Sequence, residues 1–463
     1  EIPDSVTDIS ARAFYNCTKL SSVKLPLGWN NVPDYNYNSN NSSWYQSPFV
    51  GCTALTEITL PEGMTTVPSQ AFREMTSLEA VVLPDSIKTI SSDAFYNCTG
   101  LKNITFSKNL ETISSDAFYN CKSLTMLNLP DSLKTIDYSA FYNCSGLTSV
   151  TFSEGLTTIG DSAFSNCSGL TSVEIPTSIT IINSSVFSGC SGLTSVTLPE
   201  TLTTIYSYAF SGCTSLESVE IPDSVTDISA RAFYNCTKLS SVKLPLGWNN
   251  VPDYNYNSNN SSWYQSPFVG CTALTEITLP EGMTTVPSQA FREMTSLETV
   301  VLPDSIKTIG DCAFYGCTGL KNITFSKNLE TISSDAFYNC KSLTTLNLPD
   351  SLKTIDYSAF YNCSGLTSVT FSEGLTTIGD SAFSNCSGLT SVEIPTSITI
   401  INSSVFSGCS GLTSVTLPET LTTIYSYAFS GCTSLESVEI PDSVTDISAR
   451  AFYNCTKLSS VKL

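Results

Sequence analysis

Histidine is absent from the 463 residues of this chain. Its absence excludes every catalytic triad, general base and zinc site that depends on an imidazole. Glycine-rich phosphate loops and Cys-x-x-Cys pairs are also missing. The chain contains no run of about 18 apolar residues, so no membrane-spanning helix is predicted. Acid–base chemistry by two carboxylates is the enzymatic route that stays open in principle. The prediction is a protein that is not an enzyme and has no cofactor and no metal site.

Positive charge is scarce. Only 21 Lys and Arg residues stand against 41 Asp and Glu residues, which gives a formal net charge of −20, and charged residues of both signs make up 13% of the chain. A strongly acidic surface repels nucleic-acid phosphates and anionic lipid headgroups. We therefore expect neither nucleic acid nor an anionic membrane surface as a partner.

Cysteine, by contrast, is abundant and periodic. Over one long stretch it recurs every 23 residues, at Cys98, Cys121, Cys144, Cys167, Cys190, Cys213 and Cys236. A single 23-residue unit holds too few apolar residues to close a core, whereas stacked units cover the open faces of their neighbours. The spacing therefore predicts a solenoid.

The unit that ends at Cys213 shows how each coil is built. Residues 194–198 alternate polar and apolar side chains, which predicts a short strand, and Pro199 ends it. An Ala-Phe pair followed by Cys predicts a single helical turn. The residue before Cys is Asn or Gly in nearly every coil, and these types tolerate a left-handed backbone. Glu74 and Glu293 are the exceptions, so strain or a different turn is expected there.

The frame C-x-x-L-x-x-V-x-L-P-x-x-L-x-x-I-x-x-x-A-F-x-x-C, from Cys190 to Cys213, resembles a leucine-rich repeat. It is most similar to the BspA-like branch of bacterial and protozoan surface proteins. The resemblance covers the whole chain, although Thr201 stands where the general consensus has Asn or Cys. Together with the periodicity it implies an α/β repeat. The expected fold is a curved, right-handed solenoid of 23-residue coils, with one parallel sheet and short helical turns.

Eighteen cysteines would ordinarily suggest disulfides or zinc. Seventeen of them occupy one column of the repeat, and Met75 and Met294 fill the same column. Because Met neither cross-links nor binds zinc as a thiolate, the column predicts buried, reduced thiols. Stacked Cys would lie about 5 Å apart, so geometry alone leaves disulfides open. Cys312 lies off the column and is predicted to be the one accessible thiol, either reactive or a chance substitution.

The chain also repeats on a larger scale. Residues 1–219 and 220–438 differ at only six positions, and residues 439–463 begin a third copy. The frame runs through each join, so we expect one continuous solenoid over residues 1–463. The chain begins within a coil and stops on a strand, and no signal peptide opens it. We therefore expect a window of a longer protein.

Each block carries a twelve-residue insertion that interrupts the frame between Pro26 and Cys52. Trp29 and Val32 are predicted to take inward Leu and Ile places, and Pro48-Phe49 replaces Ala-Phe. The segment predicted to bulge out is rich in aromatic residues set among Asn and Ser. Loops of this kind often bind ligands, but the rings could equally fold back over their own coil. The candidate ligand-binding residues are Tyr35, Tyr37, Trp44, Tyr45, Tyr254, Tyr256, Trp263 and Tyr264.

The exposed face of the predicted sheet is mostly small and polar, with a weak apolar spot at Ala80, Val82 and Met126, and solvated surface is the simplest interpretation. A column of carboxylates follows the strands, for which we expect at most weak, diffuse attraction of cations.

Two functions are consistent with these features. The first, implied by the family resemblance, is a cell-surface or extracellular adhesin whose partners are host or neighbouring-cell proteins or glycans. The second is a structural spacer or filament body, for which self-association is an option.

Overall fold

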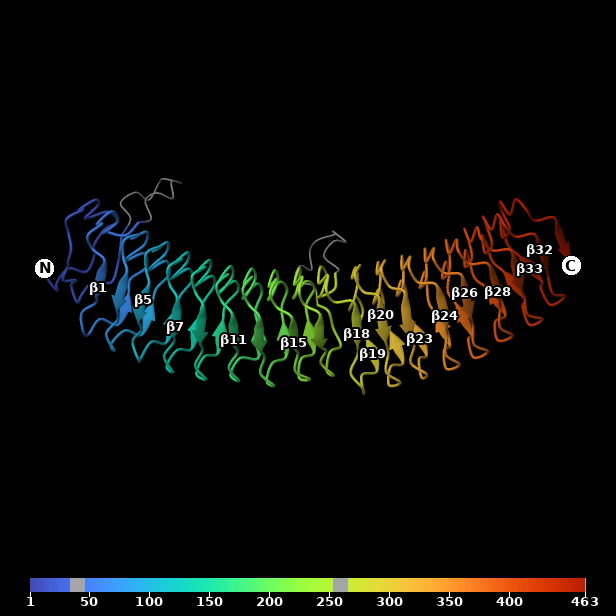
Figure 1. Cartoon of the computed structure of the whole chain (residues 1–463), viewed down its shortest axis with the longest axis horizontal. Coiled ribbons are helices and arrows are strands. Elements are labelled where there is room, and N and C mark those ends of the chain that lie inside the picture. The colour runs from blue at the N-terminus through green and yellow to red at the C-terminus, as the bar shows by residue number, and fades with distance from the viewer. Residues whose placement is uncertain (34–45, 253–264, 463) are drawn as a thin grey trace. The chain divides into compact units, whose positions relative to one another are not determined.

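A computed structural model describes residues 1–33, 46–252 and 265–462 (Figure 1). By contacts the chain divides into two compact units. Unit 1 comprises residues 1–224 and 232–239, and unit 2 comprises residues 225–231 and 240–463. Each unit is a stack of parallel coils of about 23 residues, which confirms the predicted solenoid. The extension of the stack over all 463 residues as one continuous solenoid stays a prediction.

The strand that the alternating pattern predicts is present in both units as a three-residue strand. In its parallel register each residue pairs with the one 23 positions further on, as in Ile58 with Val81. The central residue points inward and its neighbours are exposed. In unit 1 these strands are β1 (Glu57–Thr59), β3 (Ala80–Val82), β5 (Asn103–Thr105), β7 (Met126–Asn128), β9 (Ser149–Thr151), β11 (Ser172–Glu174), β13 (Ser195–Thr197) and β15 (Ser218–Glu220). In unit 2 they are β17 (Ser241–Lys243), β18 (Glu276–Thr278), β20 (Thr299–Val301), β22 (Asn322–Thr324), β24 (Thr345–Asn347), β26 (Ser368–Thr370), β28 (Ser391–Glu393), β30 (Ser414–Thr416), β32 (Ser437–Glu439) and β34 (Ser460–Lys462).

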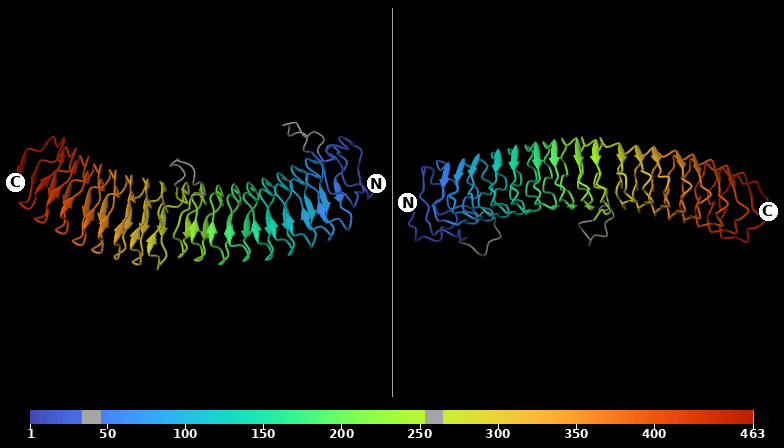
Figure 2. Two further views of the ribbon diagram at one scale, coloured as in Figure 1. Left: turned by 180° about the vertical axis from the view of Figure 1, so that it is seen from behind. Right: turned by 90° about the horizontal axis from the view of Figure 1, so that it is seen from below.

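A second ladder was not predicted. Two-residue strands, mostly Thr-Ile, pair in parallel on the returning arm of each coil, as in Thr89-Ile90 with Thr112-Ile113. In unit 1 they are β2 (Thr66–Val67), β4 (Thr89–Ile90), β6 (Thr112–Ile113), β8 (Thr135–Ile136), β10 (Thr158–Ile159), β12 (Ile181–Ile182) and β14 (Thr204–Ile205). In unit 2 they are β16 (Asp227–Ile228), β19 (Thr285–Val286), β21 (Thr308–Ile309), β23 (Thr331–Ile332), β25 (Thr354–Ile355), β27 (Thr377–Ile378), β29 (Ile400–Ile401), β31 (Thr423–Ile424) and β33 (Asp446–Ile447). The expectation of one parallel sheet is therefore corrected to two ladders. Figure 2 shows strands of successive coils following one another along each stack.

The Ala-Phe segment is not a helical turn, because no helix is assigned anywhere in the described parts of the chain. Between Asp93 and Cys98, successive backbone N–H groups alternate between a carbonyl of the same coil and a carbonyl of the next coil. Tyr96 N donates to Asp93 O at 3.1 Å, whereas Phe95 N donates to Ala117 O and Asn97 N donates to Tyr119 O, both at 2.7 Å. Coil-to-coil bonding at this corner replaces the hydrogen bonds that a helix would need.

Left-handed residues make this alternation possible. Asp93 and Asn97, on either side of the Ala-Phe-Tyr segment, have φ of 58° and 59°. The prediction for the residue before Cys is confirmed, and Glu74 and Glu293 adopt the same conformation at 62° and 61°. Glu lacks the tolerance of Gly or Asn for positive φ, so these two positions carry backbone strain.

The core consists of columns of identical side chains. Phe72, Phe95, Phe118, Phe141, Phe164, Phe187, Phe210 and Phe233 stack with ring centroids 5.1 to 5.8 Å apart, and each of these side chains is 0% exposed. Burial of each large apolar side chain contributes about 1.5–3 kcal/mol against chain entropy. Because each coil stacks on the next, this stabilisation depends on neighbouring coils rather than on any coil alone.

The contacts of the cysteine column show why Cys suits this position of the repeat. All eighteen cysteines, each within the described residues, are free thiols. Cys98 Sγ donates to Phe72 O in the preceding coil at 3.0 Å, and Cys121 Sγ repeats the contact with Phe95 O at 3.2 Å. Burial raises the pKa of Cys98 to about 12. Cys thus fills the space of a medium apolar side chain and also satisfies a buried carbonyl.

The prediction that Cys312 alone would be accessible is wrong. Cys17 is exposed, and Cys455 is half-buried like Cys312. Cys17 belongs to the first coil, whose outer side no other coil of this chain covers, so the column position by itself does not guarantee burial.

Candidate binding surfaces

The eight candidate ligand-binding aromatics, at positions 35, 37, 44, 45, 254, 256, 263 and 264, lie outside the described residues. The residues around the first insertion are described. Trp29 is 1% exposed and meets Phe49 and Phe72 edge-on at 6.2 and 5.8 Å, and Val32 is 9% exposed. The predicted inward places of both residues are confirmed. The insertion therefore leaves from a well-packed coil.

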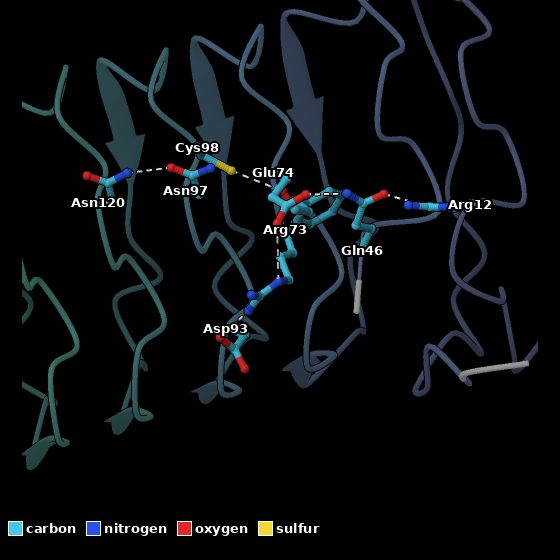
Figure 3. Close-up of polar contacts among 9 residues, drawn as sticks. Arg12, Gln46, Arg73, Glu74, Asp93, Asn97, Cys98 and Asn120 are labelled. Atoms are coloured by element: carbon cyan, nitrogen blue, oxygen red, sulfur yellow. Dashed lines mark hydrogen bonds and ion pairs between the residues drawn. The ribbon is translucent and has the colours of Figure 1, made fainter. Parts of the chain in front are cut away.

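Directly after the insertion lies a polar cluster that sequence reasoning missed. We define the loop-base cluster as Arg12, Gln46, Arg73, Glu74 and Asp93 (Figure 3). Arg12 Nε donates to Gln46 Oε1 at 2.7 Å, Gln46 Nε2 donates to Glu74 Oε2, and Arg73 forms an ion pair with Asp93 at 2.5 Å. Each of these three contacts joins residues of different coils, 34, 28 and 20 positions apart, and no repeat period signals these separations. The cluster ties the end of the insertion to the coils on both sides.

A column of half-buried tyrosines extends from this cluster. The Arg73 guanidinium lies 3.8 Å from the centre of the Tyr96 ring, Tyr96 stacks on Tyr119 at 4.6 Å, and Tyr119 stacks on Tyr142 at 4.7 Å. We call these three rings the tyrosine stack. Cation–π and ring–ring contacts of this kind contribute about 0.5–1.5 kcal/mol each. Because the rings cover one another's faces, the stack offers its edges rather than a platform for a flat ligand.

An asparagine column runs beside the tyrosine stack. Asn120 Nδ2 donates to Asn97 Oδ1, and Asn143 Nδ2 donates to Asn120 Oδ1 at 2.7 Å. These are the residues that adopt the left-handed conformation before Cys, so each of them serves both the backbone turn and a side-chain ladder. The sequence pattern indicated the first role only.

Two carboxyl groups in this region are perturbed. Burial, followed by repulsion from Asp93, raises the pKa of Asp116 to about 6, and attraction to Arg73 opposes the shift. Burial also raises the pKa of Asp93, despite its ion pair with Arg73. Perturbed carboxyls can mark functional sites, but ion-pair networks produce them as well. Among residues 1–33, 46–252 and 265–462, no group of three or more Cys, Asp or Glu side chains is placed to hold a metal ion.

The two blocks differ most at this same surface. Four of the six substitutions lie between residues 91 and 97: Ser91, Ser92, Asp93 and Asn97 correspond to Gly310, Asp311, Cys312 and Gly316. In unit 2, Gln265 keeps its bonds to Arg231 and Glu293 at 2.6 and 2.5 Å. Arg292, however, has Cys312 in place of the Asp93 carboxylate, and burial raises the pKa of that thiol. The backbone is preserved while the chemistry beside the insertion changes.

The exposed side of the three-residue strands is mostly small and polar, as predicted, and its apolar spot is confirmed by Val82 and Met126, which are 45% and 60% exposed. The carboxylates that follow the strands are used in coil-to-coil bonding, which the sequence analysis did not foresee. Asp85 accepts the backbone N–H of Lys108 at 3.1 Å, and this bond lowers the pKa of Asp85. Glu154 accepts the backbone N–H of Thr177 at 3.2 Å.

A groove of about 500 Å³ lies over β9, β11 and β13 in unit 1. It is lined by Ser149, Val150, Thr151, Phe152, Glu154, Ser172, Val173, Glu174, Pro176, Ser195 and Thr197.

Stacked parallel coils with a repeating Leu, Ile, Phe and Cys core define a leucine-rich-repeat solenoid. The family model described as "BspA type Leucine rich repeat region" matches in six copies, over residues 1–75, 42–171, 157–265, 249–366, 284–412 and 377–463. The chain belongs to this family.

The chain is also similar to solved structures. A leucine-rich repeat protein from Bacteroides ovatus ATCC 8483 is 22% identical, with a TM-score of 0.55, over 90% of this chain and 98% of that one. A leucine rich cell surface protein from Faecalibacterium prausnitzii A2-165 is 26% identical, with a TM-score of 0.36, over 85% and 87% of the two chains. No curated protein matches. In the part of the chain that the structure describes, no helix is long and apolar enough to cross a bilayer.

Proposed function

We propose that this protein is a non-enzymatic, adhesin-like binding protein of the cell surface or extracellular space, and that its aromatic insertions contact protein or glycan partners. The observation that carries the proposal is the loop-base cluster. Gln46 bonds to both Arg12 and Glu74 directly after the insertion, and Trp29 is buried just before it. A loop whose ends are fixed loses less conformational entropy when it binds a partner.

The chemistry of the insertion suits recognition. Tyr and Trp combine a large apolar surface with a polar tip, and neighbouring Asn and Ser supply hydrogen bonds that orient a ligand. A structural spacer has no use for four such aromatics in each block. Two nearly identical blocks also favour multivalent binding, because linked sites raise the effective concentration of the second contact.

The test replaces the eight insertion aromatics with Ser and measures attachment of the full chain to immobilised extracellular-matrix proteins and to a glycan array. Attachment should be lost while the melting temperature is kept. The matched control changes Tyr138 and Tyr357, which are 55% and 56% exposed outside the insertions, to Ser and should attach normally. Undiminished attachment of the eightfold variant would favour the spacer, and unfolding would show that the rings belong to the core.

A further inference from the structure

The negative charge of this chain is concentrated in two stretches. Residues 135–230 contain no Lys or Arg but nine acidic residues, namely Asp137, Glu154, Asp161, Glu174, Glu200, Glu217, Glu220, Asp223 and Asp227. Residues 354–449 repeat this composition. The rest of the chain holds 23 acidic residues against all 21 basic ones, so 18 of the 20 net negative charges belong to these two stretches.

The groove over β9, β11 and β13 lies within the first of these stretches. The ladder of three-residue strands is interrupted there, since β7 pairs with β9 and β11 pairs with β13 in separate sheets. The backbone contact from Thr171 N to Thr148 O has lengthened to 3.4 Å. The ladder also breaks between β5 and β7 and between β13 and β15. The groove spans the break between β9 and β11, where the contact from Thr171 N to Thr148 O is longer than the 2.9 Å of the next coil, from Thr194 N to Thr171 O.

The lining of the groove contains no Lys or Arg, although the Lys134 ammonium lies beside Gly155, the residue after Glu154. Among the described residues of unit 1, the ion pairs, such as Lys88–Glu111, Lys102–Glu79 and Lys108–Asp85, all precede residue 135. Glu154 accepts bonds from Thr177 N at 3.2 Å and Thr177 Oγ1 at 2.8 Å, both neutral donors. Within the described residues, neither Glu154 nor Glu174 has an ion-pair partner. An acidic groove without internal cations attracts positive ligands from solution.

We propose that this groove binds an extended, Lys- or Arg-rich peptide segment of a partner protein. Its volume of about 500 Å³ falls within the range of about 300–1,000 Å³ typical of ligand sites. Glu154 and Glu174 can accept charge-assisted hydrogen bonds from ammonium or guanidinium groups. Rows of hydroxyls from Ser149, Ser172 and Ser195 can bond to a peptide backbone.

Other occupants fit less well. A second copy of the chain carries the same charge of −20 and would be repelled. The lining has one aromatic residue, the half-buried Phe152 packed edge-on against Phe164 at 5.5 Å, rather than the several open ring faces that favour a glycan. The lining sequence recurs unchanged at residues 368–416. We therefore expect two sites per chain, both distinct from the aromatic insertions.

The experiment uses the full chain and a fluorescent ten-residue peptide of alternating Lys and Ser, with a Gln-Ser peptide as the uncharged probe. Fluorescence anisotropy is measured at about 50 and 200 mM salt, where screening differs, and calorimetry gives the stoichiometry. The Lys-Ser peptide should bind at two sites, more weakly at the higher salt, and the Gln-Ser peptide should bind at least tenfold more weakly.

The groove variant combines Glu154→Gln, Glu174→Gln, Glu373→Gln and Glu393→Gln. It should weaken binding of the Lys-Ser peptide by about tenfold or more, because the positive ligand loses the carboxylates that accept its charge-assisted hydrogen bonds in the groove. The matched control combines Glu57→Gln, Glu62→Gln, Glu276→Gln and Glu281→Gln, which removes the same charge from exposed residues outside the groove. Its binding should change by less than about threefold.

If the groove variant and the control variant lose the same affinity for the Lys-Ser peptide, the proposal is overturned. Diffuse attraction of the peptide to the whole chain would then explain binding. Equal affinity for the Lys-Ser and Gln-Ser peptides would also overturn it. If the fourfold groove variant is destabilised, the pair Glu174→Gln and Glu393→Gln provides the test, because the Glu174 carboxylate makes no hydrogen bond to other described residues. The variant with Ser in place of the eight insertion aromatics should bind the Lys-Ser peptide normally, which separates this site from the proposed function.

Discussion

Replacement of Phe210 by Ala should open the stack locally. Phe210 is 0% exposed, and its ring packs between Phe187 at 5.6 Å and Phe233 at 5.2 Å. Truncation of a buried Phe to Ala costs about 3–5 kcal/mol, because transfer energy is lost and a cavity remains. The loss of two stacked ring contacts places Phe210→Ala toward the upper part of that range.

The neighbouring thiols report this opening directly. Cys213 Sγ donates to Phe187 O at 3.3 Å, and Cys236 Sγ donates to Phe210 O at 3.1 Å. Both thiols are buried, so a labelling reagent reaches them only when the coils separate. A loss of 3–5 kcal/mol should speed their labelling by roughly a hundredfold to several thousandfold, measured by mass spectrometry under mild conditions.

Two comparisons make the experiment decisive. Phe429→Ala, at the equivalent position of unit 2 with ring contacts of 5.6 and 5.3 Å, should have a similar effect on its own neighbours. Tyr138→Ala, at a 55% exposed position, should change stability by less than about 0.5 kcal/mol. Labelling of Cys213 that is unchanged in Phe210→Ala would refute the view that each coil is held by its stacked neighbours.

Two further predictions follow from burial. Thiol labelling of the native protein should modify Cys17 first and then Cys312 and Cys455, and denaturation should expose all eighteen cysteines; early labelling of Cys121 would contradict the buried column. Burial and Asp93 raise the pKa of Asp116 to about 6, above its unfolded value near 3.9. The contribution of Asp116 to the free energy of unfolding should therefore fall as pH rises from about 4 to 6. Asp116→Asn should flatten that fall by about 1 kcal/mol, since the half-exposed carboxyl is screened; an unchanged pH profile in chemical denaturation would refute this.

The solenoid was predictable because its signal is repeated. A single alternating strand or a single Ala-Phe pair is weak evidence, but the recurrence of Cys every 23 residues requires each coil to occupy the same environment. Burial of Trp29 and the left-handed residue before Cys could be read from the same frame. The second ladder was missed because Thr-Ile is too short to show an alternating pattern. The absence of a helix was missed because coil-to-coil hydrogen bonds, which the sequence does not show, compete with the local ones of a helical turn.

The candidate surfaces were less predictable. Arg12, Gln46 and Glu74 are separated by 34 and 28 residues, intervals that differ from the repeat because the insertion shifts the register between coils. The groove at Glu154 and Glu174 has an ordinary repeat sequence, and nothing in the pattern distinguishes it from neighbouring coils.

The sequence by itself determined which residues stack into each column, and it determined the family. The reason is that one 23-residue frame places every Leu, Ile, Phe and Cys in the same position of successive coils. Only the tertiary structure decided which polar residues meet. Side chains such as Gln46 and Arg73 find partners across coils, and those meetings depend on the register of the stack and on the turn geometry at Asp93 and Asn97. Apolar columns tolerate any neighbour of similar size, whereas hydrogen bonds require particular atoms at particular distances.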